Sequence, residues 1–263
     1  MYILENENFN IYRFDVGNEG RTYQYIVKCN ETSECVVIDP LDPVSLLHFI
    51  RDNQLRVAEV LNTHGHPDHI GGNNPIIKVF LDSRIHIHRE GLDFVAPRTV
   101  VIDEGDVITF GNQSISVINT PGHCPEHVSF IIGNNIFVGD TIFLSGCGNV
   151  KFRGDVNVLF DTFNEKIRKL DDNMNIFCGH DYAINNLEYA LSVDPNNQAI
   201  NDKIDKLSKS DDALSTVAEE RLYNPFMRFD NEGLVTNLKE KYPEMDTDGR
   251  SVFTKLRELR NNW

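Results

Sequence analysis

Residues 63–72, THGHPDHIGG, place three histidines and one aspartate within a few positions of one another. The four side chains are His64, His66, Asp68 and His69. A single histidine most often has a packing or surface role, but imidazole and carboxylate groups at this density are typical of a metal site. The stretch follows VAEVLN, an apolar segment that predicts a buried strand ending where the cluster begins.

Three more polar side chains follow predicted strands in the same way. His123 comes after SISVINTPG, Asp140 after NIFVG and His180 after NIFCG. Loops held by a rigid sheet are where binding residues concentrate. The sequence therefore predicts that all seven side chains, imidazoles and carboxylates, supply the ligands of one site.

Seven such ligands are too many for one tetrahedral ion, but they suit two divalent ions that share one carboxylate. Zinc is our first expectation, and iron or manganese would accept the same ligands. Two cations roughly 3.5 to 4 Å apart polarise a carbonyl and hold a water as hydroxide at neutral pH. The pattern thus predicts a hydrolase that needs no serine or cysteine nucleophile.

Composition and charge narrow the class of protein. The apolar fraction of 40% suits a packed globular chain. A net charge of −15 argues against nucleic-acid or anionic-membrane partners, because their phosphates would be repelled. No apolar run approaches the roughly 20 residues that span a bilayer, and MYILENENFN does not resemble a secretory signal. With an odd number of cysteines, we expect reduced thiols in a cytoplasmic protein, and we expect a monomer.

Residue periodicity predicts two blocks of strands with helices outside them and an all-helical tail, hence an α/β (α+β) fold. The predicted strands cover residues 9–17, 22–29, 34–39, 57–63, 84–88, 106–110, 114–120, 127–132, 135–140 and 175–180. The predicted helices cover residues 42–54, 156–170, 183–193, 196–209, 213–223 and 252–263. Asn134 and Asn135 are expected to form a hairpin turn.

Three further residues near these ligands are expected to support the site. Asp39 ends a predicted strand and is expected to orient the ligand loop. His127 is expected to support the fold rather than bind metal. Cys124 is expected to fill space beside His123.

THGHPDH, TPGHC, VGD and CGHDY, in this order, resemble the four metal motifs of the metallo-β-lactamase superfamily. The resemblance covers roughly residues 10–182 and implies an αββα sandwich with the metals at one edge of its two sheets. ERLYNPFMR and the final VFTKLRELRNNW resemble the helical C-terminal domain of glyoxalase II, the hydroxyacylglutathione hydrolases. This implies a metal-binding domain in residues 1–182 and a glutathione-binding domain in residues 183–263.

The family resemblance also implies residue roles. His64, His66 and His123 would hold one metal, Asp68, His69 and His180 the other, and Asp140 would bridge them. Asp68 and Asp140 would be the catalytic carboxylates, acting with a hydroxide between the metals. The reaction implied is hydrolysis of S-D-lactoylglutathione to D-lactate and glutathione.

The same resemblance implies that Arg257 and Arg260 bind the glycine carboxylate of glutathione and that Tyr182 places its hydroxyl against the tripeptide. The loop GCGNVKFRGD departs from the family pattern by one extra residue between Gly148 and Gly154. Either Lys151 supplies the family's lysine contact or Phe152 fills the aromatic position that follows it.

Several other functions share parts of this pattern. A glutathione persulfide dioxygenase would use one iron on His64, His123 and Asp140, and a lactonase or other small-ester hydrolase would not need Arg257 and Arg260. A nuclease conflicts with the negative charge. A metal-stabilised binding module conflicts with seven ligands and no closed structural site.

Overall fold

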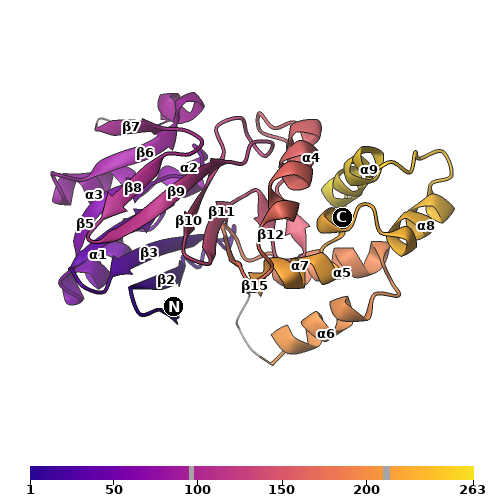
Figure 1. Cartoon of the computed structure of the whole chain (residues 1–263), viewed down its shortest axis with the longest axis horizontal. Helices are drawn as coiled ribbons and strands as arrows, with labels where there is room; N and C mark the ends of the chain where they lie inside the picture. The colour runs from indigo at the N-terminus through magenta and orange to yellow at the C-terminus, as the bar shows by residue number, and fades with distance from the viewer. Residues whose placement is uncertain (95–97, 210–213) are drawn as a thin grey trace. The chain divides into compact units, whose positions relative to one another are not determined.

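The computed structural model describes residues 1–94, 98–209 and 214–263 (Figure 1). They form two compact units. One contains Met1–Asn119 and Glu126–Gly139, and the other contains Thr120–Pro125 and Asp140–Trp263. The predicted helix over residues 213–223 starts at Ala213, which lies outside the described residues.

The first unit contains a seven-stranded sheet in which the strands follow one another in chain order. Its first four strands are antiparallel, and the last three join in parallel. Parallel strands end at the same sheet edge, so the loops after them start from one side. The strands are β1 (Tyr2–Glu5), β2 (Phe9–Asp15), β3 (Tyr23–Cys29), β4 (Glu34–Ile38), β5 (Arg56–Leu61), β6 (Arg84–His88) and β7 (Thr99–Ile102).

A second layer of the first unit consists of four antiparallel strands in the order β8-β9-β10-β11. They are β8 (Val107–Phe110), β9 (Gln113–Asn119), β10 (Val128–Ile132) and β11 (Asn135–Gly139). The predicted hairpin turn was wrong by one residue, because Ile132 pairs with Asn135 and the turn is therefore Gly133–Asn134. Gly133 has φ +52°, a conformation that glycine adopts without a steric cost.

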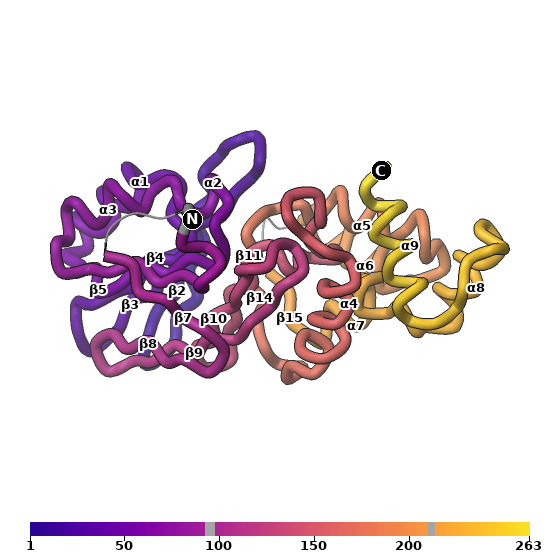
Figure 2. Tube along the Cα trace, turned by 90° about the horizontal axis from the view of Figure 1, so that it is seen from above, coloured from indigo at the N-terminus to yellow at the C-terminus, as the bar shows by residue number. Residues whose placement is uncertain are grey.

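Two helices cover the outer face of the seven-stranded sheet, α1 (Pro43–Asp52) and α3 (Asn73–Val79). Leu46 and Ile50 of α1 and Ile76 of α3 pack into one cluster with Val37 and Val60 of the sheet. On the other face, the rings of Tyr25 and Phe137 join the two sheet layers, with centroids 5.1 Å apart. Figure 2 shows this order of helices, first sheet and second sheet within the unit.

The second unit is mainly helical. A cluster of phenylalanine rings, with Phe253 of the last helix at its centre, packs that helix against α4 and the segment after α7. Its helices are α4 (Val156–Glu165), α5 (Ala183–Val193), α6 (Gln198–Leu207), α7 (Val217–Tyr223), α8 (Glu232–Lys241) and α9 (Gly249–Asn261), with 3₁₀ turns η2 (Ile167–Lys169) and η3 (Pro225–Met227). Its strands pair as β12 (Ile142–Phe143) with β13 (Gly146–Cys147), and as β14 (Asn175–Cys178) with β15 (Ser215–Thr216).

The sequence prediction missed several short elements. It gave no strand after residue 182, but β15 pairs with β14 there, and it gave no helix at α8. Its helix over 156–170 ends at Glu165, where a 3₁₀ turn takes over. It also missed β1, β7, α3, the β12–β13 pair and the 3₁₀ segment η1 (Arg89–Phe94). Most of these elements are too short for periodicity to distinguish from loops, but α8 has ten residues, as many as α1, so its length does not explain why it was missed. Among the described residues, no helix is both long and apolar enough to cross a bilayer.

Candidate metal centre and anion pocket

The histidine-rich stretch follows β5 and includes a one-turn helix that the sequence did not predict, α2 (Pro67–Ile70). Proline at its first position has the backbone angle a helix requires and needs no N–H partner. His66 is the N-cap residue, but its side chain does not cap the helix. Asp68 and His69 lie in the helical turn. This turn places four donor side chains in one short segment.

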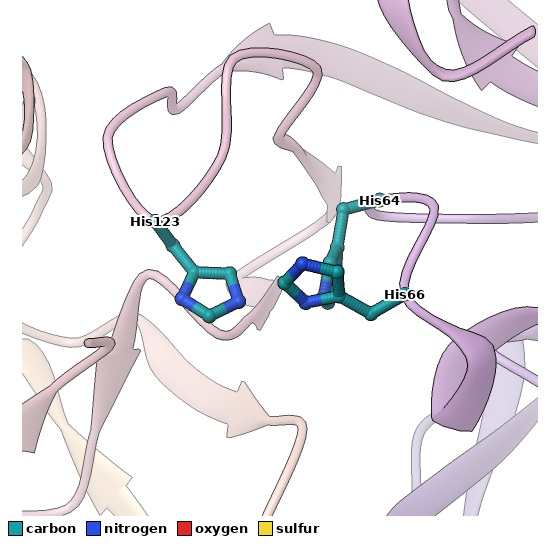
Figure 3. A group of neighbouring side chains, drawn as sticks. All are labelled: His64, His66 and His123. Atoms are coloured by element: carbon teal, nitrogen blue, oxygen red, sulfur yellow. The ribbon is translucent and has the colours of Figure 1, made fainter. Parts of the chain in front are cut away.

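The imidazoles of this segment lie close to one another. Nε2 of His64 is 3.0 Å from Nδ1 of His66 (Figure 3). The ring centroids of His64 and His69 are 4.2 Å apart. Nε2 of His69 is 3.9 Å from Oδ2 of Asp68. His64 and His69 are fully buried, so their nitrogens are held in a fixed, largely dry environment.

Asp39 fixes the orientation of one of these rings. Its Oδ2 lies 3.0 Å from Nδ1 of His69 and accepts a hydrogen bond from Oγ1 of Thr63 at 2.6 Å. Its Oδ1 accepts a hydrogen bond from the Thr63 backbone N–H at 2.8 Å. A carboxylate on Nδ1 fixes the tautomer and leaves Nε2 to bind a metal. Asp39 thus occupies the orienting position that the sequence predicted.

The second unit brings the other three predicted ligands together. His123, in the loop after β9, donates from Nδ1 to the carbonyl oxygen of Asn149 at 2.7 Å. Its Nε2 is 3.6 Å from Oδ2 of Asp140, and Nε2 of His180 is 3.4 Å from the same oxygen. All three residues are buried. Two ring nitrogens therefore face one carboxylate oxygen at distances longer than a hydrogen bond, as expected for donors arranged around cations.

The donor set fits divalent metal ions. It offers imidazole nitrogen and carboxylate oxygen, and its orienting bonds come from Asp39 and the Asn149 carbonyl.

Cys124 and His127 are buried, and the ring of His127 stacks on His64 with centroids 4.9 Å apart. These two positions agree with the packing roles expected for them.

The second unit also contains a pocket of about 320 Å³ with three cationic side chains in its wall, Lys151, Arg257 and Arg260. No carboxylate side chain occurs among the described residues that line it, although the chain has a net charge of −15. The other lining residues are Phe143, Cys147, Asn149, Tyr182, Asn186, Asn261 and Trp263. A cationic pocket in an acidic protein indicates an anionic ligand.

Arg257 and Arg260 are held differently in this pocket. Arg257 is buried, and its Nη1 donates to the carbonyl oxygen of Cys147 at 2.8 Å. Its Nε is buried and has no hydrogen-bond partner among the described residues. Arg260 donates from Nε to Oδ1 of Asn186 at 3.2 Å. Burial and the adjacent charge of Arg257 lower the pKa of the Arg260 guanidinium. Both effects favour binding of an anion beside the pair.

The remaining predicted binding residues have different positions. Tyr182 lines the pocket, and its ring stacks on His180 with centroids 5.0 Å apart and planes 7° from parallel. Lys151 lines the pocket too, whereas Phe152 is 65% exposed and is not in the wall. The roles assigned to these residues stay predictions.

The sequence analysis overlooked other residues of the wall. Asn186 lies on the buried face of α5 and orients Arg260, but an asparagine in an amphipathic helix gives no signal of such a role. Trp263 is the single tryptophan of the chain, and this rarity was the one available signal.

Comparison with known proteins agrees with this arrangement. Residues 17–180 match the metallo-β-lactamase superfamily, and residues 181–263 match the hydroxyacylglutathione hydrolase C-terminus. A hydroxyacylglutathione hydrolase from Polaromonas sp. is 36% identical over 95% of this chain and 98% of its own. The chain belongs to the hydroxyacylglutathione hydrolases. The family and the fold inferred from the sequence are thereby confirmed.

Other proteins resemble this hydroxyacylglutathione hydrolase in sequence or in fold. An Arabidopsis thaliana protein named cytoplasmic hydroxyacylglutathione hydrolase is 34% identical, covering 91% of this chain and 93% of its own. Among solved structures, ETHE1 from Myxococcus xanthus has a TM-score of 0.67 at 20% identity, covering 95% of this chain and 97% of its own. TTHA1623, solved in a di-iron-bound form, has a TM-score of 0.59 at 23% identity, covering 82% and 99%. The fold and the His/Asp groups together support divalent-metal binding by this chain.

Proposed function

We propose that this chain hydrolyses S-D-lactoylglutathione to D-lactate and glutathione. The observation that carries the proposal is the pocket with Lys151, Arg257 and Arg260 in its wall, within a strongly acidic chain of this family. The two carboxylates of glutathione need cations to bind an acidic protein, and this pocket supplies them.

The proposed ligand assignment follows the family motifs. His64, His66 and His123 would hold one ion, Asp68, His69 and His180 would hold the other, and Asp140 would contribute its carboxylate to both. Zinc is the proposed metal, with iron or manganese as alternatives, because imidazole and carboxylate accept all three. Such ions, when bound, lower the pKa of a water to about 7 and polarise a carbonyl oxygen.

The chain's own residues position the substrate. Arg257 and Arg260 are proposed to bind the glycine carboxylate, since the buried Nε of Arg257 is left without a partner among the described residues. Lys151 adds a third cation, and Tyr182 presents its hydroxyl to the tripeptide. The glutathione thiol has a pKa of about 8.5, so it departs as a thiolate without a strong general acid.

The proposed organisation assigns the metal ligands to residues 1–182 and glutathione recognition mainly to residues 183–263, with Lys151 and Tyr182 contributed from the first part. We propose that the protein is a monomer. We also propose that it acts in the cytoplasm, and this is supported by the name of the Arabidopsis relative, which calls that protein cytoplasmic. The proposed partner is a small thioester, with no nucleic acid or membrane.

The test is steady-state hydrolysis of S-D-lactoylglutathione by metal-replete protein. We expect kcat/KM in the range of about 10⁴ to 10⁸ M⁻¹s⁻¹ found for enzymes on their own substrates. A metal-loaded protein without turnover would contradict the proposal. Oxygen uptake with glutathione persulfide would then identify a dioxygenase, and hydrolysis of lactones without dependence on Arg257 would identify a lactonase.

A further inference from the structure

Glu220 is a fully buried acid on α7 and is not one of the predicted metal ligands. Its Oε2 accepts hydrogen bonds from the backbone N–H of Ser145 at 2.9 Å and from Nδ2 of Asn224 at 2.8 Å. No ion pair to Glu220 occurs in the part of the chain that the structure describes. A buried carboxylate without an ion pair is costly, so its position indicates a role beyond packing.

The turn that Glu220 holds has a strained backbone. Ser145 lies between the two-residue strands β12 and β13 and has φ +56°, a conformation unfavourable for residues other than glycine. Asn224 donates to the carbonyl oxygen of Gly146 at 3.0 Å, and Oγ of Ser145 lies 3.5 Å from the Tyr223 carbonyl oxygen. The turn is therefore fixed from outside by the end of α7.

The same segment continues into the anion pocket. Arg257 donates to the carbonyl oxygens of Cys147 and Gly148, at 2.8 and 3.3 Å. Gly148 packs so tightly that a Cβ there would lie 1.9 Å from the carbonyl oxygen of Asp140. A displacement of the turn at Ser145 would thus move the backbone that anchors Arg257.

We propose that Glu220 is a positioning residue for glutathione binding, because it holds the Leu144–Ser145 turn between β12 and β13, and this turn fixes the Cys147–Gly148 wall of the pocket. The identity of the ligand rests on the proposed function. The mechanical link between Glu220, the turn and Arg257 does not depend on it.

The charge of Glu220 gives the link a pH dependence. Burial raises the pKa of Glu220 to about 7, although hydrogen bonds with Ser215, Asn224 and Ser145 act in the opposite direction. The charged or titratable groups that interact with it are Lys203 on α6 and Tyr223 on α7. An ionised carboxylate accepts a hydrogen bond more strongly than a protonated one. Glutathione affinity should therefore decrease as the pH falls from 8 to 6.

The experiment titrates metal-replete protein with S-methylglutathione and follows the fluorescence of Trp263, the single tryptophan, which lines the pocket. The methyl group removes the thiol titration of the probe. We expect Glu220→Gln to raise the Kd about fivefold at pH 8, the effect of replacing a charged acceptor by a neutral one, and to abolish the pH dependence. Adding Ser145→Gly should restore part of the affinity, since glycine adopts the turn without strain.

Glu219→Gln is the matched control. It removes a negative charge from the same helix, and with it the ion pairs to Lys203 and Lys206, while the amide oxygen can keep the capping contact with Thr216 and the turn is not touched. Equal effects of Glu219→Gln and Glu220→Gln would overturn the proposal, as would a Glu220→Gln variant that binds like the wild type. If the wild-type protein binds S-methylglutathione but does not hydrolyse lactoylglutathione, the proposed function is contradicted and the positioning role of Glu220 is not. If the wild-type protein does not bind S-methylglutathione, both the proposed function and the role of Glu220 in glutathione binding are contradicted.

A second measurement needs no variant. The Ser145 amide proton of the wild type should lose protection from exchange between pH 8 and 6, after correction for the intrinsic rate. Constant protection over this range would contradict the positioning role.

Discussion

Arg257 and Cys147 are joined by a buried hydrogen bond, from Nη1 to the carbonyl oxygen at 2.8 Å. The bond fixes the guanidinium against the pocket wall before any ligand arrives. A donor fixed in advance loses little conformational entropy on binding, and this favours affinity. Arg257 therefore uses Nη1 for the observed bond to the Cys147 carbonyl oxygen, and its Nε is left for the proposed contact with the glycine carboxylate of glutathione.

Replacing Arg257 with alanine should raise KM for lactoylglutathione by about 10- to 100-fold and lower kcat much less. The substitution removes a charged hydrogen bond that stabilises the bound substrate and the transition state equally. Steady-state kinetics at saturating metal measure both constants. Arg250→Ala is the control, since Arg250 lies on the same helix but pairs with Asp161 at the surface. A large loss of kcat at constant KM would contradict the binding role.

Asp39→Asn should weaken metal binding by about 10- to 100-fold, because an amide holds Nδ1 of His69 less well than a carboxylate does. Competition with a chelator, followed by metal analysis, measures this change directly. Asp42→Asn tests a nearby carboxylate whose contacts are to the N-terminus of α1 instead. Equal metal retention by the Asp39 variant and the wild type would show that the orienting contact has no effect.

The loop that departs from the family pattern gives a separate test. Lys151 lines the pocket and Phe152 is exposed, so Lys151→Met should raise KM several-fold through loss of a cation, whereas Phe152→Ala should change it little. Measuring KM at low and high salt distinguishes an electrostatic contact of Lys151 from a packing contact of Phe152, since salt screens only the attraction between Lys151 and the anionic substrate. The reverse ranking would assign the family's contact to Phe152.

The sequence could single out candidate donor residues because metal ligation restricts residue type, and three histidines and an aspartate within residues 64–69 suit a metal site far better than a packed core; their roles as ligands stay a prediction. It predicted the longer strands because apolar residues alternate with polar ones along strands such as β2 and β9, or form short apolar runs, as in β11. It did not predict α2, whose single turn is too short to show a helical period. Nor did it predict the contact of Glu220 with Ser145, because hydrogen bonds between residues 75 positions apart depend on tertiary packing.

Glu220 should also make stability depend on pH. Its pKa is raised from the ordinary value of 4.5 to about 7 by burial, so the folded state binds its proton more tightly than the unfolded state. The stabilisation from that proton is complete below about pH 4.5 and is lost as the pH rises through 7. From pH 5 to 8 the free energy of unfolding of the wild type should fall by about 3 kcal/mol relative to Glu220→Gln. Urea denaturation of both proteins at a fixed metal concentration measures the difference, and parallel pH profiles would show that Glu220 stays ionised throughout.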